Sequence, residues 1–467
     1  MKEEDLLHAE TYRDRVSTVN KTGGRNWVYA LKPKGKWFNY RKVLAYFYLA
    51  IFFIMPFIKV NGLPFLMINV PKGKFILFTK IFWPQDFFIF AVAMITFIVF
   101  IVLFTVVFGR LFCGWVCPQT VFLEFVFRPI EWLIEGTPSQ QKKLNANKWT
   151  KEWILKKSLK HFIYFFISFV IAHTFLSYVL GIDEVIKVIK EPVTEHIGLL
   201  SGLIIFTYLF YGVFAFVREI VCTTICPYGR LQGVMFDKDT MQISYDYNRG
   251  EPRGKLHKNE ERKEGDCINC MKCVQVCPTG IDIRNGLQME CVGCTACIDA
   301  CDEVMETVHF EKGLIRYASE NEITTGKKFV FNARIKAYTG LLLILFIFMM
   351  TLVATRKTID TFIARVKGPL YQEVGEDKLS NLFDAKIINK TKYKVPITLK
   401  LEELEGSVKL VGDKEIVLKS ETVNERTFFL EIPKKEIKKR STSIKIGVYK
   451  DGEKIQTIKT KFLGPFI

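Results

Sequence analysis

Cysteine is absent from both ends of this 467-residue chain, and all twelve cysteines lie between residues 113 and 301. Residues 360–467 contain neither cysteine nor histidine, which excludes chemistry that depends on those side chains in this region. No Cys-x-x-Cys-His sequence is present, so the chain has no c-type haem attachment site. Walker and Rossmann glycine motifs are also missing, which argues against nucleotide-driven chemistry.

Acidic residues are too few to balance the basic ones. The 66 Lys and Arg against 48 Asp and Glu give a net charge of +18. A basic excess can indicate nucleic-acid binding, but this chain is 49% hydrophobic and contains 41 phenylalanines. Since that composition is typical of a membrane protein, we interpret the excess as loop charge and expect no nucleic-acid partner.

Five apolar runs are long enough to cross a bilayer, which takes about 20 helical residues. They cover residues 43–60, 87–109, 161–181, 197–217 and 337–355. The first run lacks a small-residue cleavage site, so we do not expect a cleavable signal peptide. Residues 119–135 mix apolar and charged side chains and predict an interfacial helix instead of a sixth span.

The number of Lys and Arg residues alternates between high and low in the segments that flank and join these runs. Residues 1–42, 110–160 and 218–334 carry ten, nine and sixteen of them, whereas 61–86 and 182–196 carry three and two. The positive-inside rule therefore predicts an inner-membrane protein whose amino terminus and cysteines face the cytoplasm. The segment after residue 356 is expected in the periplasm of a Gram-negative cell, and its lack of cysteine agrees with an oxidising compartment.

The carboxy-terminal segment has a period of two. Short runs alternate apolar and polar residues, and Asp451-Gly452 is a hairpin signal. About seven such strands predict an Ig-like β-sandwich, for which a docking or scaffold role is favoured over a ligand site. The runs are 382–389, 395–402, 407–412, 414–419, 426–433, 441–451 and 453–463.

Eight cysteines form two runs with the same C-x2-C-x2-C-x3-C spacing. In bacterial ferredoxins, three close cysteines bind one [4Fe–4S] cluster and the fourth binds the other cluster. A zinc site or a disulfide framework rarely has this spacing, so we predict two [4Fe–4S] clusters. The crossover assigns Cys267, Cys270, Cys273 and Cys301 to cluster 1, and Cys277, Cys291, Cys294 and Cys297 to cluster 2.

The other four cysteines form two C-x3-C-P pairs at the ends of the second and fourth apolar runs. Each pair follows an arginine and precedes a phenylalanine by ten residues, which indicates an internal duplication. On a continuing helix each pair shares one face, so the thiols could converge to bind Cu(I) or cycle to a disulfide. We expect Arg110 and Arg218 to lower the pKa of these thiols. The pairs, Cys113 with Cys117 and Cys222 with Cys226, could also hold a third cluster or serve only as packing residues.

Two histidines lie in or beside the apolar runs. His173 is inside the third run, and His196 precedes the fourth. An ionisable group at membrane depth is a functional candidate, and a hydrogen-bonded packing role is the alternative for His173. Met349 and Met350 are more typical of apolar filling than of copper ligands.

The order of these motifs resembles the FixG/RdxA/CcoG family of cytochrome c oxidase accessory proteins. The resemblance covers nearly the whole chain and includes Asp302, which stands where proline usually follows a ferredoxin run. It implies that the chain reduces Cu(II) to Cu(I) in the assembly of a cbb3-type oxidase, with copper at the four helix-end cysteines. The motifs are FWPQDF at 82–87, GRLFCGWVCPQTV at 109–121, C-x3-C-P at 222–227, the dicluster run ending CDEVM and the Ig-like region.

We therefore predict a multi-pass α-helical membrane protein with five transmembrane helices, a cytoplasmic dicluster ferredoxin domain and a C-terminal Ig-like β-sandwich. The resemblance implies a cupric reductase whose partners are cbb3-type oxidase subunits, copper-delivery proteins and a cytoplasmic electron donor; a homodimer stays open. Alternatives are a NapH-like quinol-oxidising polyferredoxin and a scaffold that its clusters only stabilise. The predicted segments are a tail at 1–42, four helices at 43–220, the ferredoxin domain at 221–334, a fifth helix at 335–356 and the sandwich at 360–467.

Overall fold

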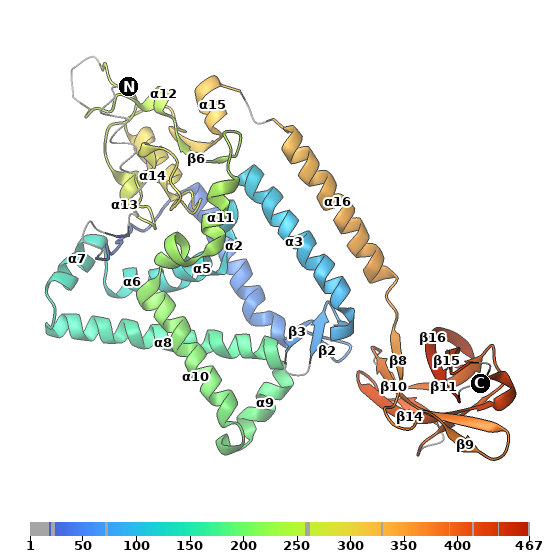
Figure 1. Cartoon of the computed structure of the whole chain (residues 1–467). Helices are drawn as coiled ribbons and strands as arrows, with labels where there is room; N and C mark the ends of the chain where they lie inside the picture. The colour runs from blue at the N-terminus through green and yellow to red at the C-terminus, as the bar shows by residue number, and fades with distance from the viewer. Residues whose placement is uncertain are drawn as a thin grey trace. The chain divides into compact units, whose positions relative to one another are not determined.

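The computed structural model describes most of the chain and divides it into two compact units (Figure 1). Unit 1 comprises Met1–Val70 with Phe90–Met349, and unit 2 comprises Pro71–Ile89 with Met350–Ile467. Much of the predicted tail at 1–42 lies outside the described residues. The structure describes residues 18–19, 24–70, 73–256, 262–327, 330–391, 393–412, 415–437 and 439–465.

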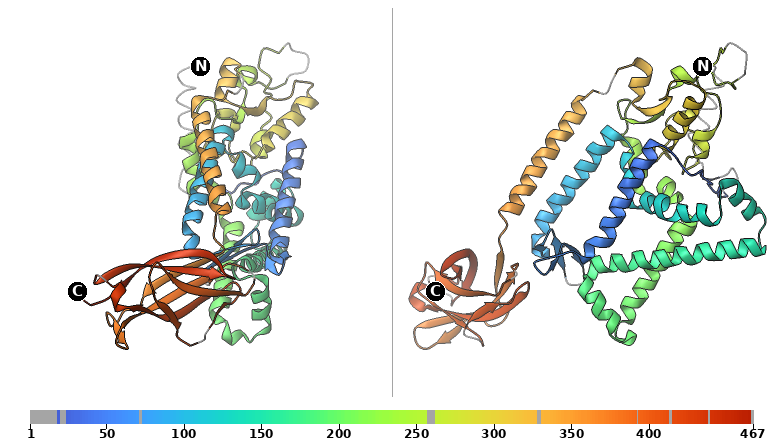
Figure 2. Two further views of the ribbon diagram at one scale, coloured as in Figure 1. Left: turned by 90° about the vertical axis from the view of Figure 1, so that its right-hand side faces the viewer. Right: turned by 180° about the vertical axis from the view of Figure 1, so that it is seen from behind.

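Five helices among the described residues are long and apolar enough to cross a membrane, as the sequence predicts. The first and third begin at Lys36 and Lys151, before the apolar runs at 43 and 161, because backbone hydrogen bonding continues through their basic first turns. Helices α3 and α16 run side by side, and Val106 and Val107 pack against Ile335 (Figures 1 and 2). The spans are α2 with its 3-10 end (Lys36–Phe57), α3 (Phe87–Phe108), α8 (Lys151–Leu180), α10 with a π-helical end (Ile197–Val217) and α16 (Ala333–Ala354).

The segment from Pro118 to Ile134 is helical and is not among the five spans. It was expected to lie at an interface, yet side chains on several of its faces are buried. The rings of Phe127 and Tyr164 of α8 meet edge to face, with their centroids 4.8 Å apart. The Tyr164 hydroxyl also donates a hydrogen bond to the Phe127 carbonyl at 2.8 Å. Other helices of unit 1 are α4 (Leu111–Trp115), α5 (Pro118–Phe122), α6 (Arg128–Ile134), α7 (Pro138–Ala146), α9 (Ile182–Lys190) and α11 (Pro227–Met235).

The dicluster region is built from loops, short helices and one antiparallel strand pair. Strand β6 (Gln242–Tyr245) pairs with β7 (Ile315–Ala318), and helices α13 (Lys272–Gln275) and α14 (Ala296–Thr307) follow equivalent cysteines. Helix α14 also holds the first span, because the Asp299 carboxylate accepts hydrogen bonds from the backbone N–H groups of Trp37 (3.1 Å) and Phe38 (2.7 Å). A carboxylate at this position satisfies helix-terminal donors and complements the positive end of the helix dipole.

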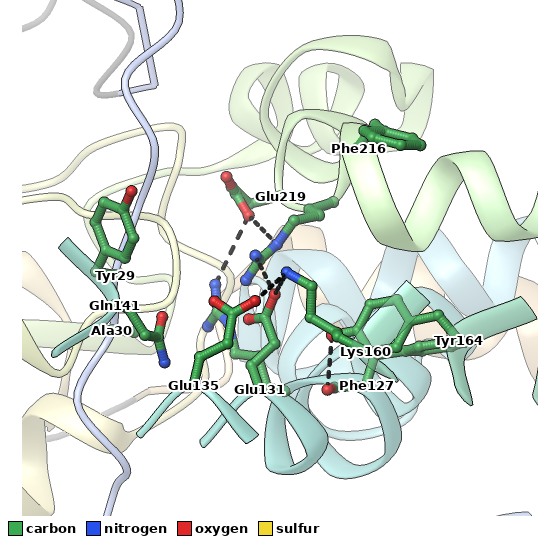
Figure 3. Close-up of polar contacts among 12 residues, drawn as sticks. Tyr29, Ala30, Phe127, Glu131, Glu135, Gln141, Lys160, Tyr164, Phe216 and Glu219 are labelled. Carbon is green, nitrogen blue, oxygen red and sulfur yellow. Dashed lines mark hydrogen bonds and ion pairs between the residues drawn. The ribbon is translucent and has the colours of Figure 1, made fainter. Parts of the chain in front are cut away.

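A buried ion-pair network joins three helices of unit 1 (Figure 3). The Glu131 carboxylate lies 2.9 Å from Arg218 Nη1 and 3.5 Å from Lys160 Nζ, and Lys160 Nζ lies 2.8 Å from Glu135. All four residues are at most 5% exposed. Because an unpaired charge at such depth would be costly, these residues constrain how α6, α8 and the segment after α10 pack together.

The network extends from these helices to the dicluster region. Arg128 pairs with Glu124 at 2.6 Å and donates to the carbonyl of Pro278, which follows Cys277, at 3.0 Å. Glu219 lies 3.4 Å from Arg218 and 3.1 Å from Arg25 of the N-terminal segment. The same charges therefore tie the helix-end region to the cysteine loops.

Unit 2 is a sandwich of two antiparallel sheets with one apolar core. The predicted runs correspond to β10–β16, and the predicted hairpin is present, with positive φ at Asp451 and Gly452 and Lys450 paired with Glu453. Two further strands, β8 and β9, were not predicted. The first sheet has the order β12 (Ser407–Leu410), β14 (Val423–Pro433), β10 (Lys378–Asn389) and β8 (Ile359–Arg365), with β9 (Gln372–Val374) on β10; the second has β13 (Ile416–Leu418), β11 (Val395–Glu402), β15 (Ser441–Lys450) and β16 (Glu453–Leu463).

Unit 2 also includes a hairpin from the segment between the first two spans, with β4 (Lys74–Leu77) paired to β5 (Lys80–Phe82). Asp86, from the FWPQDF motif, is 9% exposed and accepts hydrogen bonds from Lys390 and Arg356, both at 2.6 Å. Lys390 also pairs with Asp360. Burial raises the pKa of Asp86, but the bonds from Lys390 and Arg356 outweigh burial and keep that pKa below its usual value.

We expect Asp86→Asn to destabilise unit 2 by about 3 kcal/mol, because it leaves the buried Lys390 and Arg356 charges short of a partner. Hydrogen–deuterium exchange of the β10 amides in the full chain measures this loss. The Asp86 contribution should be present above the unfolded-state pKa of about 3.9 and lost as the pH falls through the lower folded-state pKa. Glu405→Gln, in an exposed pair with Lys435, is the control and should leave the exchange of the β10 amides unchanged. Equal exchange in both variants would contradict the assignment.

Glu131→Gln should lower the thermal stability of unit 1 strongly, with a cost of about 3–5 kcal/mol, because Arg218 and Lys160 lose a shared buried counter-charge. A second variant, Glu131→Leu with Arg218→Met, removes charges of both signs and should be less damaging than the single change. Thermal inactivation of the full-length protein in detergent compares the variants. Glu152→Gln is the matched control, because Glu152 forms an exposed pair with Lys156 on α8, the helix that also carries Lys160. A single variant as stable as this control would show that Glu131 does not hold the network.

Candidate metal centre

The eight clustered cysteines line two cavities in the dicluster region. One cavity, of about 320 Å³, is lined by Cys277, Cys291, Cys294 and Cys297 and also by Cys273. The other, of about 340 Å³, is lined by Cys267, Cys270, Cys273 and Cys301. Each set of four that the crossover rule groups together therefore surrounds one cavity. Ligation of particular irons by particular sulfurs stays a prediction.

The walls of these cavities fit a group that brings its own positive charge. Burial raises the pKa of Cys291 to about 11 and the pKa values of Cys273, Cys294 and Cys301 to about 12. Thiolates therefore form here only when a cation compensates for desolvation, and the thiols release protons as it binds. Iron–sulfur clusters are held by thiolates, so the donor set and the depth of the site both suit them.

Both sets of cysteines are largely enclosed. Cys270 is the one exposed member of the first set, and Cys277 and Cys291 are the partly exposed members of the second. The backbone after the second cysteine of each run is left-handed, with φ of 60° at Met271 and 61° at Thr295. This shared conformation shows that both runs follow the same local path.

The loop that carries Cys291 and Cys294 lies against the first C-x3-C pair, where the two backbones approach closely. A Cβ on Gly114 would lie 2.6 Å from the Gly293 carbonyl oxygen, and a Cβ on Gly293 would lie 2.7 Å from the Arg110 carbonyl oxygen. Gly293 also has a φ of +68°, which glycine adopts at no steric cost. Only glycine at both positions lets helix α4 contact the loop that carries Cys291 and Cys294.

The helix-end cysteines are not on continuing helices, so the i, i+4 prediction is wrong. Cys113 lies in α4, the helix ends after Trp115, and Cys117 is the N-cap of α5 with Pro118 in its first turn. Cys222 lies in a π-helical turn (Val221–Ile225), and Cys226 is the N-cap of α11. The prolines explain the break, since each lacks the N–H that a continuing helix requires and is suited to a first turn.

The predicted duplication is visible in the backbone. The N–H of Cys117 donates to the Phe112 carbonyl at 3.0 Å, and the N–H of Cys226 donates to the Val221 carbonyl at 2.7 Å, each reaching five residues back. The two copies are also bonded to one another. Gln119 of the first donates to the Arg218 carbonyl beside the second at 3.3 Å, and Arg110 donates to the Gly229 carbonyl of α11.

The two copies bring their four thiols together. Each of the six pairs among these thiols is close enough for the charge of one sulfur to affect the ionisation of another. Among the described residues, no three of these sulfurs lie within 4.8 Å of one another. The thiols thus form an open group, whose members are Cys113, Cys117, Cys222 and Cys226, and which we call the helix-end thiols.

The prediction that Arg110 and Arg218 lower the pKa of the helix-end thiols is wrong in its net effect. Burial raises the pKa of Cys113 and Cys222 to about 12, and it raises the pKa of Cys117. Arg110 opposes this rise at Cys113 but does not overcome it. Arg218 instead pairs with Glu131 and Glu219, so its charge is already compensated.

The histidines and methionines lie away from the thiols. His173 bonds through Nδ1 to the Phe169 carbonyl of its own helix at 3.0 Å, and His196 pairs with Glu191 at 2.5 Å. Met350 is half exposed on α16, which agrees with apolar filling instead of copper ligation.

Sequence reasoning missed the residues that hold the cysteines in place. Arg41 is buried and donates to the Gly114 carbonyl at 3.1 Å, and Tyr317 donates to the Gly293 carbonyl at 3.3 Å. Trp37 contacts both Trp115 and Tyr317 edge-on, with ring centroids 6.1 and 5.9 Å apart. The one signal available in the sequence is the basic and aromatic content of residues 25–41.

Comparison with known proteins agrees with this architecture. A family described as a 4Fe-4S dicluster domain matches residues 217–320, and a 4Fe-4S binding domain matches residues 90–136. The IG-like fold at the C-terminal of FixG matches residues 349–465. The region at residues 90–136 contains Cys113 and Cys117.

Three relatives align with most of the chain. RdxB of Cereibacter sphaeroides is 30% identical over 437 residues, which cover 87% of this chain and 89% of RdxB. RdxA of the same organism is 31% identical, covering 73% of this chain and 75% of RdxA. The nitrogen fixation protein FixG of Rhizobium meliloti is 32% identical, covering 63% of this chain and 57% of FixG. With its dicluster region, five apolar helices and Ig-like unit, the chain belongs to the FixG/Rdx family of iron–sulfur electron-transfer proteins.

Proposed function

We propose that this protein reduces Cu(II) to Cu(I) during maturation of a cbb3-type cytochrome c oxidase. The observation that supports this most directly is the convergence of four partly buried thiols beside the dicluster region. Thiolates prefer Cu(I) to harder ions, so the helix-end thiols are suited to hold the reduced product. The protein would thus act as a cupric reductase of the oxidoreductase class.

The cysteine loops and the helix-end thiols would divide the work. The eight cysteines at 267–301 would hold two [4Fe–4S] clusters, which supply one-electron transfer when bound. Arg110 anchors the first C-x3-C pair on the dicluster loop, because it donates to the Met289 carbonyl and lies 3.5 Å from the Cys291 carbonyl. Cys113 and Cys222 also pack against the dicluster core, so no other layer of protein separates the two groups of cysteines.

A second candidate for the helix-end thiols is a further iron–sulfur cluster. The match of residues 90–136 to a 4Fe-4S binding domain favours it, and so does the open spacing of the sulfurs, which exceeds the compact grouping typical of a single ion. The two candidates differ in iron content, which makes them separable by experiment.

The partners and the location follow from the same proposal. A cytoplasmic electron donor would supply the dicluster region, and Cu(I) would pass to copper-delivery proteins or oxidase subunits. The basic segments would face the cytoplasm and the Ig-like unit the periplasm, with the five helices in the inner membrane.

Reporter fusions test this orientation. Fusions after residues 140 and 310 should read cytoplasmic, and fusions after 75, 190 and 400 should read periplasmic, because lysine and arginine concentrate in the first set of segments. An alkaline phosphatase and fluorescent protein pair at each site gives opposite signals on the two sides. A cytoplasmic signal after residue 400 would overturn the five-span orientation.

Changing Cys113 and Cys117, or Cys222 and Cys226, to serine should lower Cu(I) affinity at least tenfold, because serine removes the soft sulfur. Stoichiometric Cu(II) reduction by the dithionite-reduced protein should fall with it. Iron should stay at about eight atoms per chain, four for each of two clusters. Thr224→Ala, between the cysteines of the second pair, is the matched control.

The outcomes of this experiment separate three readings. Full copper binding and reduction in the double variants would show that the thiols are packing residues. Loss of about four irons would assign them to a third cluster. Unchanged iron with loss of copper reduction supports the proposal.

A further inference from the structure

A further cavity lies between α8, α9 and α10, at the end of these helices away from the cysteines. Its volume is about 160 Å³, comparable with apolar cavities of about 150 Å³ that bind a benzene ring. Eight aliphatic side chains from the three helices and the turn after α9 form most of its wall. Its polar side chains are His173, His196 and Glu191, so the site is an apolar chamber with a few polar groups.

The hydrogen bonds of the two histidines determine what they can offer a ligand. The Phe169 carbonyl can only accept, so Nδ1 of His173 carries the proton and Nε2 is an acceptor when the ring is neutral. Nε2 of His196 lies 2.5 Å from the Glu191 carboxylate and donates to it, which makes Nδ1 of a neutral His196 ring an acceptor. When both rings are neutral, the cavity therefore has two acceptor nitrogens on separate elements.

The position of the cavity narrows the class of ligand. His173 precedes the end of α8 by seven residues, about 10 Å of helix rise, and His196 immediately precedes the α10 span. Because α8 and α10 are both candidate membrane spans, a cavity between their ends is within reach of a molecule carried in lipid. Glu191 and the absence of Lys or Arg from the lining disfavour an anionic lipid headgroup.

We propose that this cavity binds the ring of a membrane hydroquinone. Such a ring is flat and largely apolar, and its two hydroxyl groups lie on opposite sides, where each can donate to one histidine nitrogen. The aliphatic walls enclose the ring, and an isoprenoid tail extends into the lipid. The proposal concerns binding alone and is independent of the copper chemistry.

A divalent cation is the competing occupant. Ligand atoms of Glu191, Glu195 and His196 lie within 4.8 Å of one another, although Glu195 is exposed. A cation there would bring Glu195 into the site and would leave His173 without a role. The two readings therefore make opposite predictions for His173 and Glu195.

Photoaffinity labelling of the full-length protein in quinone-free nanodiscs tests the proposal. An azido-quinone, reduced before illumination, should label peptides between residues 173 and 203, and decylubiquinol should compete in a saturable way. His173→Leu and His196→Leu should each weaken competition about tenfold, the effect of losing one hydrogen bond in an apolar site. His173→Gln, which keeps an acceptor, should weaken it less.

Two controls distinguish the occupants. Thr174→Ala, at the position next to His173 on α8, and Glu195→Gln should leave competition unchanged. Labelling that decylubiquinol cannot compete away would indicate a lipid acyl chain and overturn the proposal. Zn²⁺ binding that Glu195→Gln abolishes and His173→Leu does not, with no saturable labelling, would assign the site to a cation. Visible absorbance of the dicluster region in every variant checks that each is folded.

Discussion

The buried ion pairs around Glu131 and Arg218 are the interaction on which the rest of unit 1 depends. Glu131 pairs with Arg218 beside the second cysteine pair and with Lys160 on α8. Arg128, one turn from Glu131, donates to Pro278 in the dicluster region. Charges this deeply buried are tolerated only when all of them are paired. Any other packing of these helices would leave several of the charges without a partner. The network therefore selects a single arrangement of helices, N-terminal segment and cysteine loops.

That arrangement places two kinds of thiol site in contact. The Gly114–Gly293 approach joins the first C-x3-C pair to the loop with Cys291 and Cys294, and Arg110 bonds both to that loop and to α11. Burial raises the pKa of Cys113 and Cys294 to about 12, which disfavours their thiolates when no cation is bound. Both groups of cysteines contact the same apolar core. The helix-end thiols and the cysteine loops are thus one connected region in structural terms.

A buried charged residue, Asp86, also joins distant segments of the chain in unit 2. Asp86 belongs to a segment far from the β-sandwich in sequence, yet Lys390 and Arg356 bind it. The FWPQDF motif is therefore part of the Ig-like unit, which explains why a motif between two spans accompanies that domain. The sandwich itself contains no cysteine or histidine, and all twelve cysteines of the chain belong to unit 1.

Local patterns along the chain were enough to predict several features of the protein. Apolar length predicted five spans, period two predicted strands β10–β16, and cysteine spacing grouped the eight thiols into the sets that surround two cavities. Features that depend on contacts between residues far apart in the sequence became apparent only from the three-dimensional structure. The helix breaks before Cys117 and Cys226 followed from their prolines, but thiol pKa depended on burial, which no spacing reveals. Arg218 precedes a cysteine pair in sequence, yet its charge is paired with Glu131, 87 residues away. Electrostatic and packing energies depend on distance in space, and distance in space is set by the whole fold.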